Sequence, residues 1–250
     1  RPQTAVVMRF VPVRALASAE SAALLGLWER CLRDALDPDV ADARAAGVSV
    51  GFDFGLEGLK LSLTGYGDSP ARVARHLAGR LRTFDLAPGR FADLKERTLR
   101  SLASYAQTEA WTLARDRRNA LQREVLHLPD QLLAPSQVAS WPQVQVFGHR
   151  LLAQGRLELL VHGHLPPASA VELARALARA LPLLPAAPHD LMHRRHLQLA
   201  AGEQVVDAGL VEGVNAAWIG DYLLGDDSPR QRAASLVLGS FVSSPFMTEL

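Results

Sequence analysis

The feature that most constrains the fold is a β-hairpin pattern between Gly47 and Asp68. Gly55 and Gly58 mark its turn, and large apolar residues alternate with small or polar ones on both sides: Val48, Val50, Phe52, Phe54, Leu59, Leu61 and Leu63. Side chains alternate sides along a strand, so both strands place these apolar residues on one face. Helices or a second sheet must cover that face.

Helical patterns flank this hairpin on both sides. Before it, Ser18 is a good N-cap for a helix that we expect Asp37-Pro38 to break, and a second short helix is expected over Val40–Ala46, ending at Gly47. Further helices are expected over residues 71–82, 90–105, 109–126, 140–155 and 166–181. Strands are expected over 5–10 and 157–162. This order predicts an α+β fold, an antiparallel sheet covered by helices.

The pattern restarts near the C-terminal end. Residues 181–188 contain three prolines, which is typical of a linker. Beyond them we expect strands at Leu197–Val206 and Ala216–Leu224, and a helix that Ser228 caps and that runs to about Val242. We therefore predict one full α+β domain over residues 1–188 and, over 189–250, the truncated beginning of a second, homologous domain.

Composition excludes several classes of partner. The formal net charge is only +1, without the clustered basic excess of nucleic-acid binders, and no apolar stretch is long enough to cross a bilayer. We therefore expect neither nucleic acid nor membrane as a partner. Cys31 is the only cysteine, so internal disulfides are excluded, and its apolar helical stripe predicts a buried, inert thiol. The start at Arg1 suggests a segment of a longer protein.

Two histidine pairs are candidate metal ligands. His189 and His193 are four residues apart with Asp190 beside the first, a spacing that would place both rings on one face of a helix. They follow the proline-rich segment and no third ligand is evident, so we interpret them as part of a solvated linker. His162 and His164 would share a face of a continuing strand, but the intervening glycine favours a polar turn.

The sequence gives little support for the other candidate functional residues. Glu109 and Asp116 lie two helical turns apart among Arg115, Arg117 and Arg118, a pattern that more often marks a solvated helix face than an acid–base or anion site. Ser101, Ser243 and Ser244 lack a recognisable nucleophile motif, and no glycine-rich phosphate loop precedes a helix. The tryptophans are interpreted as core or interface residues: Trp28, Trp111, Trp141 and Trp218.

Five segments in order resemble the C-terminal half of the pitrilysin and insulinase family of zinc metallopeptidases, the M16-type inverzincins. An Ala-Gly pair ends the first segment, Gly-Tyr-Gly-Asp ends the second, and a His-Gly turn closes the fourth. The segments are Leu24–Gly47, Gly58–Asp68, Phe84–Leu102, Leu151–Gly163 and Asn215–Leu250. The resemblance covers nearly the whole chain, which corresponds in this family to the third domain and the opening of the fourth.

The resemblance implies a role without catalytic groups. In this family four homologous domains enclose a chamber where peptides are cut, and the zinc ligands and general base belong to a His-x-x-Glu-His motif in the first domain. The present sequence has no such motif, and the family's substrate-holding Arg and Tyr lie just past the segment that matches Pro245–Leu250. We therefore assign no catalytic and no metal-binding residue here, and substrate-binding residues cannot be named. Zinc is expected on the N-terminal catalytic half of the parent enzyme.

The resemblance also suggests a subgroup and partners. The Ala-, Leu- and Arg-rich text resembles bacterial members such as those related to coenzyme PQQ synthesis protein F, which process a precursor peptide. We expect a chamber wall that binds or size-selects a peptide substrate, partnered by the catalytic half, in the bacterial cytoplasm or alternatively the periplasm. Exposed apolar surface and strand edges predict self-association.

Two alternatives stay open from the sequence. One is a catalytically inactive structural or binding subunit that pairs with a separate active chain. The other is a self-sufficient metalloenzyme that uses His189 and His193, which stoichiometric zinc in the purified chain would reveal.

Overall fold

The computed structural model describes residues 2–56, 58–193, 195–200, 202–209, 215–222, 225 and 228–248. Its strands are β1 (Gln3–Pro12), β2 (Ser49–Gly55), β3 (Gly58–Tyr66), β4 (Gln154–Gly163) and β5 (Leu184–Pro185). Its α-helices are α1 (Ala19–Ala45), α2 (Ser69–Thr83), α3 (Arg90–Ala103), α4 (Ala110–Gln122), α5 (Pro129–Val138), α6 (Trp141–Leu151), α7 (Pro167–Ala180) and α8 (Pro229–Thr248). Short 3-10 turns occupy Arg14–Leu16, Tyr105–Gln107 and Pro188–Asp190.

The strands form one sheet in the order β2-β3-β1-β4-β5. All pairs are antiparallel except the short parallel pair of β4 with β5. The predicted hairpin is confirmed as β2 and β3, in which Val50 pairs with Leu63 and Phe52 with Leu61. The α+β class is also confirmed, because helices cover an essentially antiparallel sheet.

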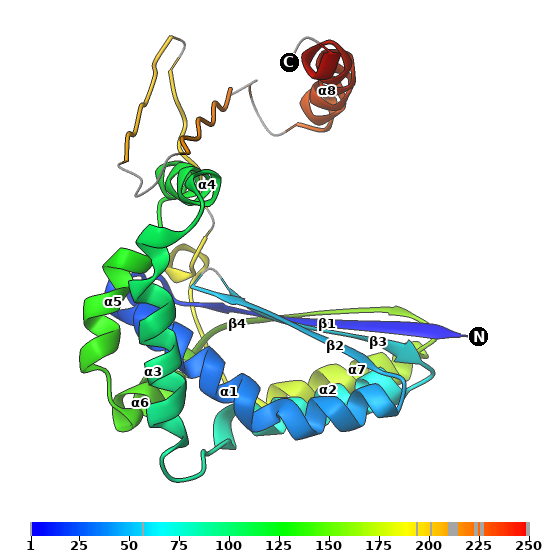
Figure 1. Cartoon of the computed structure of the whole chain (residues 1–250). Helices are drawn as coiled ribbons and strands as arrows, with labels where there is room; N and C mark the ends of the chain where they lie inside the picture. The colour runs from blue at the N-terminus through cyan, green and yellow to red at the C-terminus, as the bar shows by residue number, and fades with distance from the viewer. Residues whose placement is uncertain are drawn as a thin grey trace.

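The core lies between the sheet and the helices α1, α2 and α7, which Figure 1 shows together on one side of it. The predicted apolar face supplies the strand side of this core. Its fully buried side chains include Val6 of β1 and Leu61 and Leu63 of β3, each at most 1% exposed. Against them pack Leu32 and Leu36 of α1, Leu77 of α2, and Leu173 and Leu177 of α7.

The predicted break at Asp37-Pro38 is wrong, because α1 runs without interruption from Ala19 to Ala45 with Pro38 inside it. A proline in a helix removes one backbone hydrogen bond and normally costs about 3 kcal/mol. Here Leu36 and Val40 on either side are both buried, and burial of such side chains contributes about 1.5–3 kcal/mol each. The beginning and end agree with prediction: Ser18 accepts from the Ser21 amide, and Gly47 follows with φ of 78°.

A second group of helices lies at one end of the sheet. Helix α5, which the sequence did not predict, packs on α1 and α3, and α6 also packs on α1. Trp28 of α1 and Trp141 of α6 are joined through Phe84, with ring centroids 6.0 and 6.1 Å from it. The core interpretation is therefore confirmed for these two tryptophans, whereas Trp111 and Trp218 are 52% and 84% exposed.

The expected helix over 140–155 is also shorter than predicted, because α6 ends at Leu151 and Gly155 belongs to β4. Gly155 lies directly opposite Pro12 of β1. A side chain there would meet the Val11 carbonyl oxygen at 2.4 Å, and the residue has φ of 157°. The glycine therefore allows close strand contact and does not terminate a helix.

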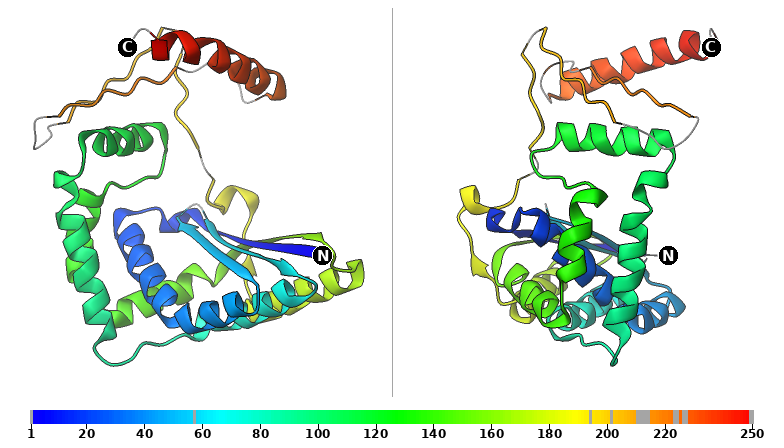
Figure 2. Two further views of the ribbon diagram at one scale, coloured as in Figure 1. Left: turned by 45° about the vertical axis from the view of Figure 1, so that its right-hand side comes forward. Right: turned by 60° about the vertical axis from the view of Figure 1, so that its left-hand side comes forward.

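The expected strands at Leu197–Val206 and Ala216–Leu224 are not formed in the described part of those ranges. The adjoining His196 makes an isolated bridge with Arg123, and Leu197 donates to the Gln122 carbonyl oxygen at 2.8 Å. A strand requires a neighbour for its backbone groups, and beyond Leu197 no described segment pairs with the described part of either range. Both views of Figure 2 place the described part of this extended segment beyond α4, away from the sheet.

The C-terminal region exposes apolar side chains, as expected for a surface that associates. On α8, Leu236 is 76% exposed and Phe241 is 73% exposed. Val206 and Tyr222 of the extended segment are more than 80% exposed. Among the described residues, no helix has the length and apolar content that a membrane-spanning helix needs.

Candidate functional site

One face of the sheet is free of packed helices in the described part of the chain (Figure 1). The side chains at the centre of this face, on β1 and β3, are short. Two successive rows cross strands β2, β3, β1 and β4: Ser49, Thr64, Ala5 and His162, then Gly51, Ser62, Val7 and Leu160. We name these eight residues the open face. Five of the eight are glycine, alanine, serine or threonine, and Leu160 is 63% exposed.

A row of charged residues borders the open face at the hairpin end of the sheet. In register across the four strands it contains Asp53, Lys60, Arg9 and Glu158. Arg9 lies 3.4 Å from Glu158, which is also paired with Arg156 at 2.7 Å. Arg9 and Lys60 lie directly opposite one another, an arrangement of like charges that destabilises a sheet unless anions are near.

A cleft of about 390 Å³ opens beside this charged row. The sheet contributes Arg9, Asp53 and Lys60, and the residues around the hairpin turn contribute Phe54, Gly55, Leu56 and Gly58. The first turns of α1 and the segment 123–127 form the other walls. His127 fixes that segment, because its Nε2 lies 2.9 Å from the Ala17 carbonyl oxygen. Cleft volumes of this size are typical of sites for small molecules or single peptide residues.

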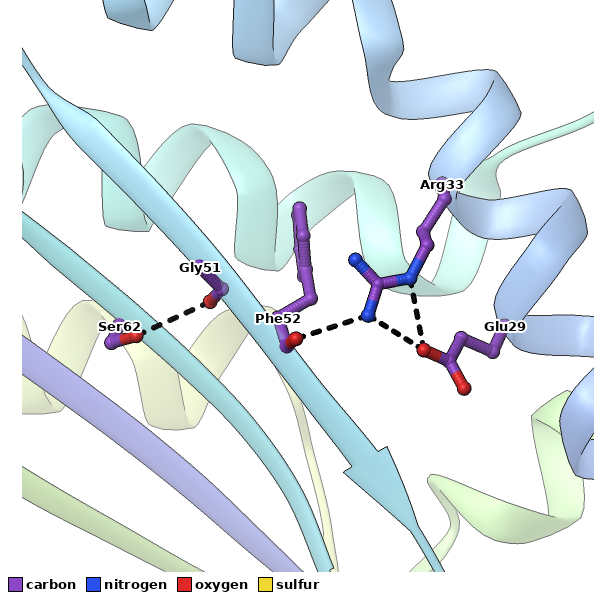
Figure 3. Close-up of polar contacts among 5 residues, drawn as sticks. All are labelled: Glu29, Arg33, Gly51, Phe52 and Ser62. Carbon is purple, nitrogen blue, oxygen red and sulfur yellow. Dashed lines mark hydrogen bonds and ion pairs between the residues drawn. The ribbon is translucent and has the colours of Figure 1, made fainter. Parts of the chain in front are cut away.

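A clasp between α1 and the edge strand β2 lies next to the cleft (Figure 3). Arg33 donates to the Glu29 carboxylate at 2.6 and 2.9 Å and to the Phe52 carbonyl oxygen at 3.0 Å. Its guanidinium also lies 5.3 Å from the Phe52 ring centroid. The clasp occupies a backbone acceptor on the sheet edge, which otherwise could pair with another strand.

The charged cluster on α4 connects to the C-terminal segment. Arg117 donates two hydrogen bonds to Asp207, at 2.7 and 2.8 Å, and these hold the pKa of the Asp207 carboxyl below its usual value. Arg118 lies 3.5 Å from Asp221. Both arginine side chains stay about a third exposed, at 36% and 34%, and each also pairs with an acid of the C-terminal segment. They attach residues beyond 194 to α4.

The two acids of that cluster are not brought together as an acid–base pair. Glu109 accepts a hydrogen bond from the Trp111 indole at 2.6 Å, whereas Asp116 lies 3.3 Å from Arg115. The Arg115 guanidinium stacks over the Trp111 ring at 4.7 Å. Burial first, and then the Asp116 charge, raise the pKa of Tyr105.

The candidate histidines lie apart from the open face, except for His162 at its edge. His189 belongs to a 3-10 turn and not to an α-helix, its side chain is 83% exposed, and His193 contacts the Pro188 carbonyl oxygen at 2.8 Å. The solvated-linker interpretation fails for Leu191 and Met192 between them, which are at most 2% exposed. No cluster of three or more potential ligands occurs among the described residues.

His162 and His164 also behave differently from a metal clip. His162 is the penultimate residue of β4, and His164 follows the strand, where its backbone amide donates to the Gln3 carbonyl oxygen at 3.1 Å. Gly163 between them has φ of 108°, a conformation that favours glycine. The predicted polar turn at the strand end is confirmed.

The sequence did not point to the cleft residues as a group. The alternation of the hairpin does place Lys60 on the face opposite Leu59 and Leu61. No local pattern, however, joins Lys60 to Arg123 or to Gly26 of α1. Only the packing of three distant segments brings these residues to one cleft.

Comparison with protein families gives one match. Residues 1–135, just over half of the chain, match the family model described as the middle or third domain of peptidase M16. This segment includes the hairpin, all the residues that line the cleft and the helices up to the first turns of α5.

Two curated relatives are much longer than this chain. Human insulin-degrading enzyme is 26% identical over 180 residues, which are 69% of this chain and 17% of that protein. A putative zinc protease of Caenorhabditis elegans is 23% identical over 230 residues, covering 87% of this chain and 26% of that protein. The matched part of the chain thus spans about a sixth to a quarter of the length of these relatives.

Two solved structures share the fold. Pitrilysin superposes with a TM-score of 0.68 at 19% identity, covering 73% of this chain and 19% of that chain. The structure described as a peptidase M16 inactive domain from Pseudomonas fluorescens superposes with a TM-score of 0.58 at 16% identity, covering 74% of this chain and 47% of that one.

Proposed function

The chain belongs to the M16 peptidase family, whose middle or third domain its residues 1–135 match, and we propose that it serves as a non-catalytic part of a larger zinc endopeptidase. In this role it forms one wall of a chamber that encloses a peptide. The metal and the general base belong to the catalytic half of the parent enzyme, which is its principal partner. The putative zinc protease among its relatives supports zinc as the metal of that half.

The open face is the observation that carries this proposal. A sheet with both faces covered would be purely structural, whereas here the described helices pack on one side only. Ala5, Val7 and Ser62 present little relief at the centre of the other side. An extended peptide can lie across such a surface without a deep pocket for each side chain.

The physical contribution of this wall is positioning. Cleavage requires the scissile peptide bond to be held near the metal-bound water, and holding it costs translational, rotational and conformational entropy. Contacts along a wall offset that cost before the chemical step. They also limit the size of peptide that can be enclosed, so the wall affects the specificity of the enzyme.

The substrate and the domain division are further parts of the proposal. We take the precursor peptide of coenzyme PQQ as the substrate to be tested first, in a bacterial cytoplasmic enzyme. The division into a unit at 1–188 and a second homologous unit from 189 stays a prediction. The attachment of residues beyond 194 to α4 through Arg117 would then be a contact between the two units.

A second arrangement has one observation in its favour. The Pseudomonas fluorescens structure is described as an inactive domain, and 47% of that chain corresponds to the present one. The same wall could therefore belong to an inactive subunit that pairs with a separate active chain. The two arrangements differ in whether a His-x-x-Glu-His motif precedes these residues on one polypeptide.

The proposal is tested by placing bulk on the open face of the parent enzyme. Val7→Trp adds a large side chain at the centre of that face, and tryptophan is well accommodated in strands. Arg72→Trp on α2, where the side chain is 68% exposed, is the matched control on the covered side. We expect kcat/KM for an extended peptide to fall about tenfold with the first variant only. Equal activity of both variants would refute the proposal.

A further inference from the structure

The cleft beside the open face has an excess of unsatisfied positive charge. Lys60 and Arg123 both line it, and neither side chain has a hydrogen bond or ion pair among the described residues. Lys60 also lies directly opposite Arg9, so two cations meet on adjacent strands. Because Glu158 lies 3.4 Å from Arg9, the cations of the cleft that remain for an anionic ligand are Lys60 and Arg123.

Neither of the two acids among the described lining residues, Glu29 and Asp53, forms an ion pair with Lys60 or Arg123. Glu29 is already engaged by Arg33, which donates two hydrogen bonds to the same carboxylate oxygen. Asp53 is opposite Lys60 in the register of β2 and β3, but the two do not come within ion-pair distance among the described contacts. Asp53 is therefore available to accept a hydrogen bond from a ligand amide.

Apart from His127 and the glycines, the remaining lining residues of the cleft are apolar: Ala22, Leu25, Phe54, Leu56, Val125 and Leu126. Gly26 of α1 also lines it, and a side chain at that position would find no atom within 4 Å. A glycine inside a helix costs about 1 kcal/mol relative to alanine, and here it keeps the space above the helix free.

We propose that this cleft binds the C-terminal residue of a peptide, an inference that rests on the proposed peptide-enclosing function and deepens it. The α-carboxylate lies at the cationic rim with Lys60 and Arg123, and an apolar side chain occupies the space above Gly26. A C-terminal residue carries both groups on one Cα, which matches an apolar cavity with cations at its rim. Asp53 receives a backbone N–H of the same peptide.

Binding of defined probes to the parent enzyme tests this assignment, with a chelator present to prevent cleavage. The probe is the fluorescently labelled peptide Gly-Ser-Gly-Ser-Leu with a free C-terminal carboxylate. The same peptide as its C-terminal amide removes only the charge, and Gly-Ser-Gly-Ser-Ser removes only the apolar side chain. An amidated peptide with an internal glutamate reports on side-chain carboxylates. Fluorescence anisotropy gives the Kd of each.

Two substitutions separate the rim from the apolar space. Lys60→Gln should weaken binding of the free-acid peptide about tenfold, which is the loss expected for a charge-assisted hydrogen bond. It should leave the Kd of the amide peptide unchanged. Gly26→Leu should raise the Kd of both leucine peptides to that of the serine peptide. Arg156→Gln on β4 and Gly79→Leu on α2, another helical glycine with no atom within 4 Å, should retain wild-type Kd values.

The outcomes separate this inference from the proposed function. Equal binding of acid and amide by the wild-type enzyme, tighter binding of the internal-glutamate peptide, or unchanged Kd values in both cleft variants would overturn the assignment. These binding results do not depend on the kcat/KM of the Val7→Trp enzyme, so the proposed wall function is tested separately. Conversely, a selective tenfold loss with Lys60→Gln would establish the carboxylate site even if the open face proved inert.

Discussion

The contact between Gly148 of α6 and Trp28 of α1 allows a stability test with a defined sign. A Cβ atom at position 148 would lie 2.1 Å from Trp28 Nε1 and 2.5 Å from Trp28 Cδ1. Trp28 is only 2% exposed and contacts the Phe84 and Phe54 rings, so it cannot simply turn toward solvent. The Gly148→Ala substitution therefore forces a shift of α6 or of a core tryptophan.

The expected magnitude follows from two opposing effects. Overpacking a core by one methyl group costs about 1–3 kcal/mol, and an overlap this deep belongs at the upper end. Alanine recovers up to about 1 kcal/mol of helix propensity over glycine. We expect a net loss of about 2 kcal/mol in the free energy of unfolding, or a Tm lower by about 4–8 °C for a chain of this size.

The matched control is Gly79→Ala in α2, where an added Cβ meets no atom within 4 Å. That variant should gain about 0.5–1 kcal/mol, because only the propensity effect acts. Urea unfolding followed by tryptophan fluorescence and by circular dichroism measures both variants. If Gly148→Ala proved as stable as Gly79→Ala, the packing of α6 against Trp28 described here would be refuted.

Two further predictions concern ionisation. Burial raises the pKa of the Cys31 thiol to about 12, so this thiol should react far more slowly with iodoacetamide at pH 8.5 in the native chain than in urea. Its protonated form is favoured in the folded state, so stability should fall as pH rises from 9 toward 12, and Cys31→Ala should reduce that fall. The Arg90 guanidinium, which donates to Asp34 at 2.5 and 2.9 Å, holds the pKa of that carboxyl below its usual value. The stability that this pair contributes is present at pH values above the pKa of Asp34 in the unfolded chain. It is lost as the pH falls through the lower pKa of Asp34 in the folded chain. An NMR titration should show a higher pKa for Asp34 in the Arg90→Gln variant. An unchanged Asp34 pKa in that variant would contradict the assignment.

The hairpin and the two ends of α1 could be predicted from the sequence, because residues close in sequence determine them. The alternation around Phe52 and Leu61 specified the hairpin and its buried face, because a shift of one residue would expose every apolar side chain. Ser18 and Gly47 likewise mark the limits of α1 through their own backbone hydrogen bonds and conformation. These features need no knowledge of distant residues.

The errors arise where tertiary contacts override local preference. Pro38 stays inside a helix because buried neighbours on both sides hold it there. Helix α5 begins at Pro129 and contains Pro135, so its sequence suggested a break, yet it packs against α1 and α3. The sequence after Leu197 has a strand-like pattern but forms no strand in its described part, because β-propensity alone does not supply a partner strand.

The cleft shows the same limit for function. Gly26, Lys60 and Arg123 come from a helix, a strand and a loop that are far apart in sequence, and each is unremarkable in its own neighbourhood. The resemblance to the peptidase family predicted what kind of surface to expect. The location of charge and free space on that surface required the three-dimensional arrangement.

The most direct test of the wall function compares the parent enzyme with and without these 250 residues. Zinc content and cleavage of an extended peptide are measured on the same preparations. The account predicts that zinc stays stoichiometric while kcat/KM falls by at least tenfold, because it assigns positioning of the peptide to these residues and the metal to the catalytic half. Undiminished kcat/KM in the shortened enzyme would contradict the account.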